Sequence, residues 1–294
     1  MISEQNPHFR LDNVSLKVGK QLTLSQWIVG FFFIGLTWTS VGGRATFLAI
    51  EITRNRTWST IKWVTYLTQH INFVILLLAI ILFILIAVRV TIKTYITNAP
   101  TFRWSLFWFS AGVWLVGIST ATLFTAIIEP ESIMGNPTTR LTDRFFLILI
   151  ALVLTPVQCI AEELLFRTTL WRMLTYRVQK GWGISVISGL IFTLAHLANL
   201  EVQSANFSLP IVGFYFLSGY LFMEMTRIHE GTEAALGAHI ANNMFLVLVI
   251  NYVGSSLPSD PWFIQQAPSI WVDLIVLVAC SSVVIHYGKK WQRQ

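Results

Sequence analysis

The sequence predicts an all-α protein built as a polytopic transmembrane helix bundle with about eight membrane helices. Three observations predict this fold class. The 294 residues are 54% hydrophobic and only 12% charged, whereas soluble domains carry roughly a quarter charged residues. The mean hydropathy is +0.64. Apolar segments also recur along the chain at lengths near the ~20 residues that a membrane helix needs.

Eight apolar segments follow one another along the chain. Each is expected to be a helix, because lipid offers no partner for free backbone groups. The run FVILLLAIILFILIAV has no apolar–polar alternation, so it does not fit a strand of a membrane barrel. The first segment is interrupted by Gly42, Gly43 and Arg44. The segments are about Leu24–Ile50, Phe73–Val90, Trp104–Ile128, a fourth that starts near Phe145, Gly183–Asn199, Leu209–Thr226, Ala234–Val253 and Ile270–Tyr287.

Basic residues favour an orientation with both termini in the cytoplasm. Fourteen Lys and Arg residues then lie in inner segments, among them Arg10, Lys17, Lys20 and Arg167, and six lie in outer loops. This is the bias of the positive-inside rule. The polar first 25 residues argue against a cleaved signal peptide. The net charge of +6 comes without a basic run or a Gly-rich phosphate loop, so we expect no nucleic-acid partner.

The ionisable and amide side chains within apolar segments are concentrated in the second half of the chain. Such groups are costly in lipid and usually mark a site or a proton path. Their uneven distribution is the main sequence clue to function. They are Glu162, Glu163, Arg167, His196, His239, Asn242 and Asn243.

The stretch CIAEELLFR carries two adjacent glutamates and an arginine. Glu163 and Arg167 are four residues apart, so they share one helix face and can neutralise each other. Glu162 then points elsewhere with no local partner, and a carboxylate free to take a proton suits a general base. The alternative is the solvated, charged end of a helix.

Two histidines in later segments have companions at helical spacing. His196 follows Phe192 by four residues, and it either serves a site or packs against that aromatic ring. His239 and Asn243 are also four apart, and two donors on one helix face suit a developing oxyanion. The alternative for this pair is hydrogen bonding between membrane helices.

The spacing of the polar groups predicts where they meet. The fourth helix is expected to continue through EELLFRTTLWRMLTY and to turn at Gln179–Gly181, since Lys180-Gly181 is a good helix stop. Glu162 and His196 then stand at equal height in a helical hairpin. The three polar sets can therefore converge at one depth.

These motifs, EExxxR, FxxxH and HxxxN in this order, resemble the CPBP intramembrane proteases. That family includes the type II CAAX prenyl endopeptidases and bacterial homologues linked to bacteriocin processing and self-immunity. The motifs read Glu162-Glu163-Leu-Leu-Phe-Arg167, Phe192-Thr-Leu-Ala-His196 and His239-Ile-Ala-Asn-Asn243. The resemblance covers about residues 145–253.

The resemblance implies a glutamate-dependent endopeptidase. Glu162 would activate a water with help from His196, and His239 and Asn243 would hold the oxyanion. Glu163 and Arg167 would position and tune that site. The implied protein needs no cofactor and acts on a peptide or protein substrate at the bilayer. We therefore expect a multi-pass protein of a bacterial cell membrane, with prenylated tails and bacteriocin leaders both open as substrates.

Other chemistry stays open on the same residues. Glu162, His196 and His239 could form a His₂Glu zinc set, although no HExxH is present. Cys159, one turn before Glu162, could be a nucleophile with His196. Neither Cys159 nor Cys280 predicts a disulfide. A non-enzymatic transporter or scaffold is the alternative class.

The resemblance also suggests a division of the chain into three parts. Residues 1–140 would be accessory membrane helices, residues 141–253 the catalytic core, and residues 254–294 a C-terminal membrane helix.

Overall fold

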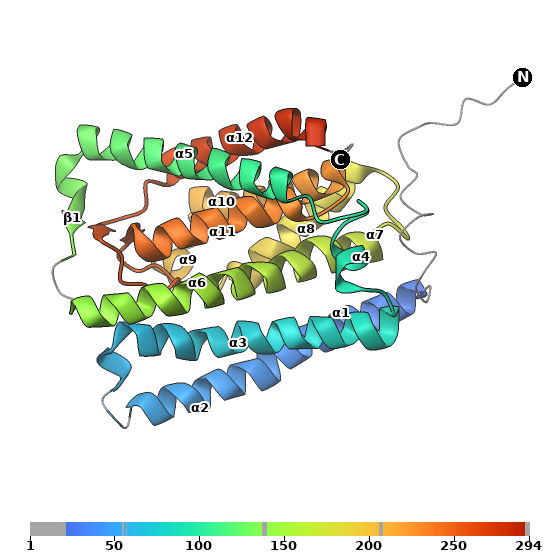
Figure 1. Cartoon of the computed structure of the whole chain (residues 1–294), viewed down its shortest axis with the longest axis horizontal. Coiled ribbons are helices and arrows are strands. Elements are labelled where there is room, and N and C mark those ends of the chain that lie inside the picture. Colours follow the sequence, from blue (N-terminus) through green and yellow to red (C-terminus); the bar gives the residue numbers. More distant parts are fainter. Residues whose placement is uncertain (1–21, 55, 57, 137–139, 206–207, 292–294) are drawn as a thin grey trace, which may run out of the picture.

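The structure is a computed structural model, and it describes residues 22–54, 56, 58–136, 140–205 and 208–291. The long helices run side by side along one axis of the molecule (Figure 1). The helices α1 to α3 and the helices α5 and α12 lie on opposite sides of α6 and α11 in this view. The all-α bundle predicted from composition is therefore confirmed.

The first predicted segment is one continuous helix instead of two pieces. The expected break at Gly42 and Gly43 is a π-helical turn within it. The second helix begins at Lys62, well before the predicted Phe73. Its first turns carry polar side chains that pack inside the protein, so a hydropathy pattern does not reveal them. These elements are α1 (Leu24–Leu36), η1 (Thr37–Gly42), α2 (Gly43–Arg54), η2 (Trp58–Thr60), α3 (Lys62–Leu82) and the π-helical η3 (Phe83–Val88).

The remaining helices follow the predicted segments closely. The fourth helix continues past the glutamates to Leu174, as predicted, but through a π-helical turn. The seventh ends at Leu248, and its predicted last residues form a strand. The elements are α4 (Ile92–Ile96), α5 (Trp104–Ile128), η4 (Pro130–Ser132), α6 (Leu141–Glu163), the π-helical η5 (Leu164–Thr169), α7 (Leu170–Leu174), α8 (Gly181–His196), α9 (Leu200–Ser204), α10 (Leu209–His229), α11 (Glu233–Leu248), α12 (Ile270–Tyr287) and η6 (Gly288–Trp291).

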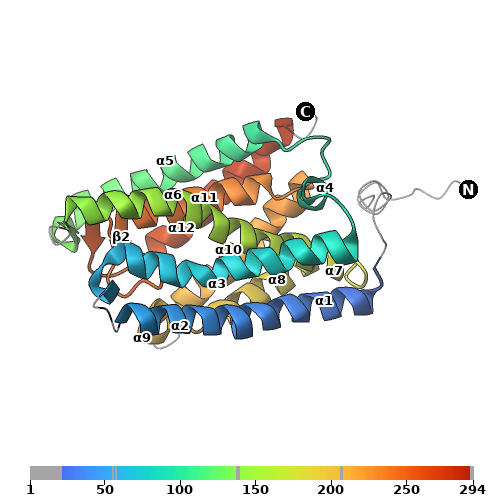
Figure 2. The ribbon, with the colours of Figure 1, turned by 60° about the horizontal axis from the view of Figure 1, so that its bottom comes forward.

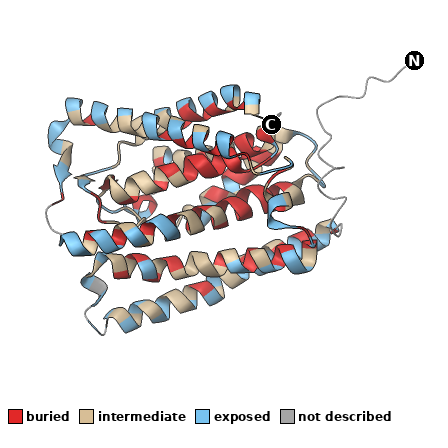
Figure 3. Ribbon diagram, in the orientation of Figure 1, coloured by how far each residue is buried: buried red, intermediate tan, exposed pale blue. Residues whose placement is uncertain are grey.

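The predicted count of eight membrane spans is not confirmed. Among the described residues, six helices are long and apolar enough to cross a membrane. The other two, α8 and α11, have 16 residues each. At about 1.5 Å per residue they fall short of a hydrocarbon core ~30 Å thick. Buried residues dominate the first turns of α11 at the centre of the bundle (Figure 3), so this helix needs little contact with lipid.

A small sheet closes one end of the bundle, and the sequence did not predict it. The strand order is β1–β3–β2, with β1 antiparallel and β2 parallel to β3. Arg144 and Asp260 form a buried ion pair beside it at 3.4 Å. The strands are β1 (Ile133–Gly135), β2 (Ile250–Tyr252) and β3 (Phe263–Gln265).

The core extends across the predicted division at residue 140. One apolar cluster joins Ile34 and Ile80 from the first helices to Leu164 and Phe192 from the later ones. A view from another side shows α3 running between α1 and α6 (Figure 2). The division into three parts stays a prediction.

Two features bear on the predicted orientation. Arg167, counted among the inner charges, is buried within the bundle. It is therefore not a loop residue and carries no information about the orientation in the membrane. Arg10, Lys17 and Lys20 lie outside the described residues. The cytoplasmic placement of both termini and the bacterial membrane therefore stay predictions.

Candidate active site

Glu162 and Glu163 lie at the end of α6 and are buried, with 4% and 1% of their surfaces exposed. Arg167 in the following π-helical turn is 0% exposed. The solvated helix end considered from the sequence is therefore wrong. π-helical turns inside α-helices are frequent at functional sites. Here the turn follows the two carboxylates directly.

Glu163 connects α6 to α11. Its Oε1 lies 2.8 Å from Nδ1 of His239, and its Oε2 lies 3.4 Å from Nε of Arg167. The predicted ion pair is present. However, neither this Oε2 nor the Arg167 Nε has a hydrogen-bond partner among the described residues, so the two groups form an ion pair without a hydrogen bond. The Arg167 Nη2 donates to the Ser218 carbonyl at 3.3 Å. Arg167 thereby ties α10 to the site.

Glu162 has a partner that the sequence interpretation missed. Gln158, one turn earlier on α6, donates from Nε2 to Glu162 Oε1 at 3.0 Å. The expectation that Glu162 lacks a local partner is therefore wrong. The i,i+4 spacing of Gln158 and Glu162 is the signal that could have found it. Glu162 Oε2 lies 3.9 Å from Nε2 of His239, which is too far for a hydrogen bond.

His239 lies between the two carboxylates. Because its Nδ1 contacts the Glu163 carboxylate, this nitrogen carries a proton and donates. A histidine held this way has a fixed ring orientation and can carry a second proton on Nε2, as in hydrolase triads. Phe222 covers the ring edge-on at 5.9 Å between ring centroids. His239 is thus positioned to offer Nε2 to the space beside Glu162.

His196 ends α8, and its ring is fixed by two contacts. Its Nδ1 donates to the Phe192 carbonyl at 2.7 Å, which leaves Nε2 with a lone pair in the neutral ring. The ring stacks on Tyr215 at 4.7 Å between centroids. Tyr215 in turn donates its hydroxyl to Glu201, and Asn199 donates to the Tyr215 oxygen at 2.9 Å. No sequence signal pointed to this supporting group.

Asn243 lies one turn beyond His239 on α11. The Asn242 Nδ2 donates to its Oδ1 at 3.2 Å, which directs the Asn243 amide. Among the described residues, the Asn243 side chain is bonded through Oδ1, so its Nδ2 is available as a donor. The predicted helix face therefore carries an imidazole and a carboxamide that both can donate.

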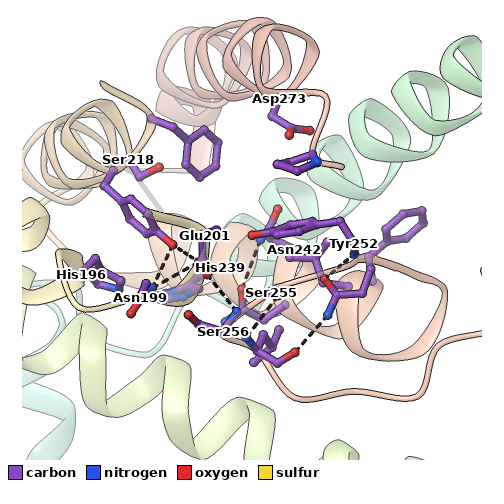
Figure 4. A pocket seen from close by; sticks show the side chains of 18 of the residues that line it. His196, Asn199, Glu201, Ser218, His239, Asn242, Tyr252, Ser255, Ser256 and Asp273 are labelled. Atoms are coloured by element: carbon purple, nitrogen blue, oxygen red, sulfur yellow. Dashed lines mark hydrogen bonds between the residues drawn. The ribbon is translucent and has the colours of Figure 1, made fainter. Parts of the chain in front are cut away.

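The structure brings four of the six predicted residues to one cavity of about 600 Å³. Glu162, His196, His239 and Asn243 line it, whereas Glu163 and Arg167 lie behind its wall. His196 and Asn199 border it from one side, and Asp273 reaches toward it from α12 (Figure 4). The cavity is large enough for a water and a stretch of extended backbone.

The structure also bears on the two other chemistries considered from the sequence, a cysteine nucleophile and a zinc site. Cys159 is fully buried and does not line the cavity, so it is badly placed for a nucleophile. In the described part of the chain, no three His, Cys, Asp or Glu side chains are arranged to hold a metal ion. The zinc reading from the sequence therefore finds no preformed ligand set, and the cofactor prediction itself stays untested.

Comparison with known proteins gives a family match for the segment that carries the candidate site. Residues 144–245, which contain all six predicted residues, match the family model for type II CAAX prenyl endopeptidase Rce1-like. This segment is therefore similar to the Rce1-like family. The family indicates a protease, and the apolar helices make this one a membrane protein.

A second comparison extends beyond the Rce1-like segment. The chain is 28% identical over 216 residues to a Bacillus subtilis (strain 168) protein named YyaK and described as uncharacterized, covering 70% of this chain and 71% of YyaK. No solved structure matches the chain.

Proposed function

We propose that this Rce1-like protein is an intramembrane endopeptidase in which Glu162 activates the hydrolytic water. The observation that carries the proposal is the single cavity lined by Glu162, His196, His239 and Asn243. A carboxylate, two imidazoles and a carboxamide around one buried cavity are the groups that peptide hydrolysis needs. Enclosure strengthens each of their electrostatic interactions.

In the proposed reaction, Glu162 removes one proton from water, and the remaining O–H of the resulting hydroxide donates a hydrogen bond to His196 Nε2. The oxygen attacks the peptide carbonyl, and the carbonyl oxygen becomes an oxyanion. Nε2–H of His239 and Nδ2–H of Asn243 donate to that oxyanion. The proton held by Glu162 then passes to the amide nitrogen as the carbon–nitrogen bond breaks. The new carboxylic acid then gives its proton to His196 Nε2, so the products are a carboxylate and an amine, and His196 passes that proton to solvent before the next cycle.

Glu163 and Arg167 act through His239 in this scheme. Glu163 accepts from Nδ1–H of His239 at 2.8 Å, and it stabilises the ring when both nitrogens carry protons. Arg167 offsets the charge of Glu163 at 3.4 Å. They are therefore positioning residues.

The proposal is tested with purified protein and a panel of membrane-near peptides. We expect cleavage by the wild type and its loss in Glu162→Ala and His196→Ala. Cleavage that persists in both variants, with the proteins folded, rejects the assignment. Activity that survives chelators argues for the metal-free scheme, whereas solute uptake driven by a gradient argues for a transporter.

The substrate is to be identified by its precursor. We expect uncleaved polypeptides to accumulate in cells that carry only the Glu162→Ala protein. Mass spectrometry of their membrane fraction distinguishes prenylated C-terminal tails from bacteriocin leaders and from other membrane-near peptides.

A further inference from the structure

A buried chain of hydrogen bonds runs from α3 to the proposed general base. His70 Nδ1 contacts the Tyr66 carbonyl at 2.7 Å, and His70 Nε2 contacts the Gln158 Oε1 at 3.0 Å. The Gln158 Nε2 then donates to Glu162 Oε1 at 3.0 Å. All four residues are buried. Residue 70 lies outside the Rce1-like segment 144–245, so the first helices contribute to the site.

With Oε1 of Gln158 facing His70, as in this structure, the contacts determine the protons on His70. A carbonyl oxygen can only accept, so Nδ1 of His70 carries a proton toward Tyr66. The Gln158 oxygen also can only accept, so Nε2 must carry a second proton. His70 is therefore an imidazolium in this arrangement. Its positive charge lies one amide away from the Glu162 carboxylate, which compensates it.

The opposite arrangement of the amide has a different consequence. Turning the Gln158 amide by a half-turn would bring its nitrogen to His70 and its oxygen to Glu162. A neutral His70 could then accept through Nε2, but Glu162 would need a proton in order to donate. Both arrangements hold the same number of protons. The Gln158 amide thus couples the charge of His70 to the charge of Glu162.

We propose that His70 and Gln158 are positioning residues that hold Glu162 as a carboxylate, with one of its oxygens occupied by the amide and the other turned to the cavity. His70 carries two protons in this resting state. The role assigned to Glu162 rests on the proposed function. The protonation of His70 does not depend on it.

The residues around this chain of hydrogen bonds hold the His70 ring in place and place several ionisable groups near Glu162. The His70 ring stacks on Tyr66 at 3.9 Å between centroids, and the Tyr66 hydroxyl meets the Thr155 hydroxyl of α6 at 2.6 Å. The other titratable groups near Glu162 are its neighbour Glu163, paired with Arg167, Cys159 one turn earlier on α6, His239 from α11 and His196 from α8. None of these groups occupies Oε1 of Glu162, which accepts instead from the Gln158 amide in the described part of the chain.

The first test measures protons directly and needs no substrate. Protein with ¹⁵N-labelled histidine is purified at neutral pH, and His70→Phe assigns the His70 signals among the six histidines. We expect two protonated ring nitrogens on His70 in the wild type. We expect only one in Gln158→Leu, which removes the amide between the two groups, and in Glu162→Gln, which keeps the contact but removes the compensating negative charge. A single ring proton in the wild type, or no difference between variants, overturns the proposal.

The second test measures the rate against pH. In His70→Phe and Gln158→Leu, kcat/KM is expected to fall about 10- to 100-fold at neutral pH, the range seen when partners that orient an active group are removed. The loss should grow toward acid pH, because these variants lack the groups that keep Glu162 ionised, so Glu162 takes up a proton more readily than in the wild type. The exposed His286→Phe is the control and should keep the wild-type profile. A uniform loss at all pH values indicates a packing role only and overturns the proposal.

The two tests separate this inference from the proposed function. If His70 carries two protons but Glu162→Gln still cleaves peptides, the proposed function fails while the coupling stands. If His70 carries one proton and Glu162→Gln is inactive, the coupling fails and the proposed function stands.

Discussion

At the scale of single residues, Glu163 is the most constrained group of the site. It is buried and contacts His239 at 2.8 Å and Arg167 at 3.4 Å. The Arg167 guanidinium also lies 4.4 Å above the centre of the Phe192 ring. Removing one partner of a buried pair leaves a charge without compensation. The site therefore depends on Arg167 for stability as well as for position.

Arg167→Met keeps much of the side-chain volume and removes the charge. We expect the free energy of unfolding to fall by about 3–5 kcal/mol, the usual cost of breaking a buried pair. The measurement is thermal or denaturant unfolding in detergent. Arg177→Met, at an exposed position, is the matched control. Equal stability of Arg167→Met and the control would contradict the pairing.

Asn243 is expected to act in the transition state. Asn243→Ala should lower kcat by about 10²–10³, as for other oxyanion donors, with little change in KM. Asn242→Ala should cost less, because Asn242 only directs the Asn243 amide at 3.2 Å. Steady-state kinetics on one peptide compare the two variants. A larger loss in Asn242→Ala would reverse the roles.

The sequence could predict part of this chemistry and not the rest. Residues spaced by four on one helix, such as Glu163 with Arg167 and His239 with Asn243, follow from helix geometry. Gln158 has the same spacing to Glu162 and was open to the same argument. His70 lies 88 residues before Gln158, and no local pattern connects positions so far apart. Only the packing of α3 on α6 brings them together.

At the scale of elements, the π-helical turn η5 is the feature that shapes the site. Its wider turn is closed by the Thr169 hydroxyl, which donates to the Leu164 carbonyl at 2.7 Å. The Tyr95 hydroxyl donates to the same Thr169 oxygen at 2.8 Å. The residues LLFRTT have no local feature that distinguishes a π turn from an α turn. The turn was not predictable because its support comes from α4, in a distant part of the chain.

Tyr95 makes the support of η5 dependent on pH. Burial raises the pKa of Tyr95 from 10.0 to about 12. The contribution of neutral Tyr95 to stability is therefore complete below about pH 10 and is lost as the pH rises toward 12. We expect the difference in melting temperature between wild type and Tyr95→Phe to be constant up to pH 10 and to shrink above it. A difference independent of pH through this window would contradict the buried, neutral hydroxyl.

At the scale of the whole molecule, the cavity has a clear charge character. The ionisable carboxylates among its described lining residues are Glu162, Glu201 and Asp273, and that lining contains no Lys or Arg. Glu201 is held by Tyr215 and by the Ser256 backbone N–H at 2.9 Å. Asp273 lies in the first turn of α12. A negatively charged peptide group would enter this space beside three carboxylates, with no Lys or Arg among the described lining residues to pair with it.

Substrate charge should therefore affect the rate. The test uses peptides that differ at one position beside the cleaved bond. We expect peptides with Lys or Gln there to be cleaved, and the peptide with Glu to have a kcat/KM lower by at least roughly tenfold. The reason is that like charges cost several kcal/mol when they are placed side by side. Asp273→Asn should reduce that difference. Equal cleavage of the Glu and Lys peptides would show that the lining charges do not select the substrate.

The bundle as a whole was predictable from composition and segment length, but its span count was not. Hydropathy finds α8 and α11 as apolar segments, yet it cannot tell that their 16 residues are packed among other helices. It also could not find the three-residue strands at one end, because their pairing joins residues 133–135 to residues 263–265. Long-range pairing of that kind leaves no local period.

The central claim is that Glu162 activates water within one cavity shared with His196, His239 and Asn243. Its most direct test is single-turnover cleavage of a fluorescent peptide by wild type and Glu162→Gln in the same lipid bilayer. A glutamine keeps the shape and the contact with Gln158 but cannot take a proton. We expect the rate to fall by about 10²–10⁴, with an unchanged melting temperature. Cleavage by folded Glu162→Gln at the wild-type rate would contradict the account.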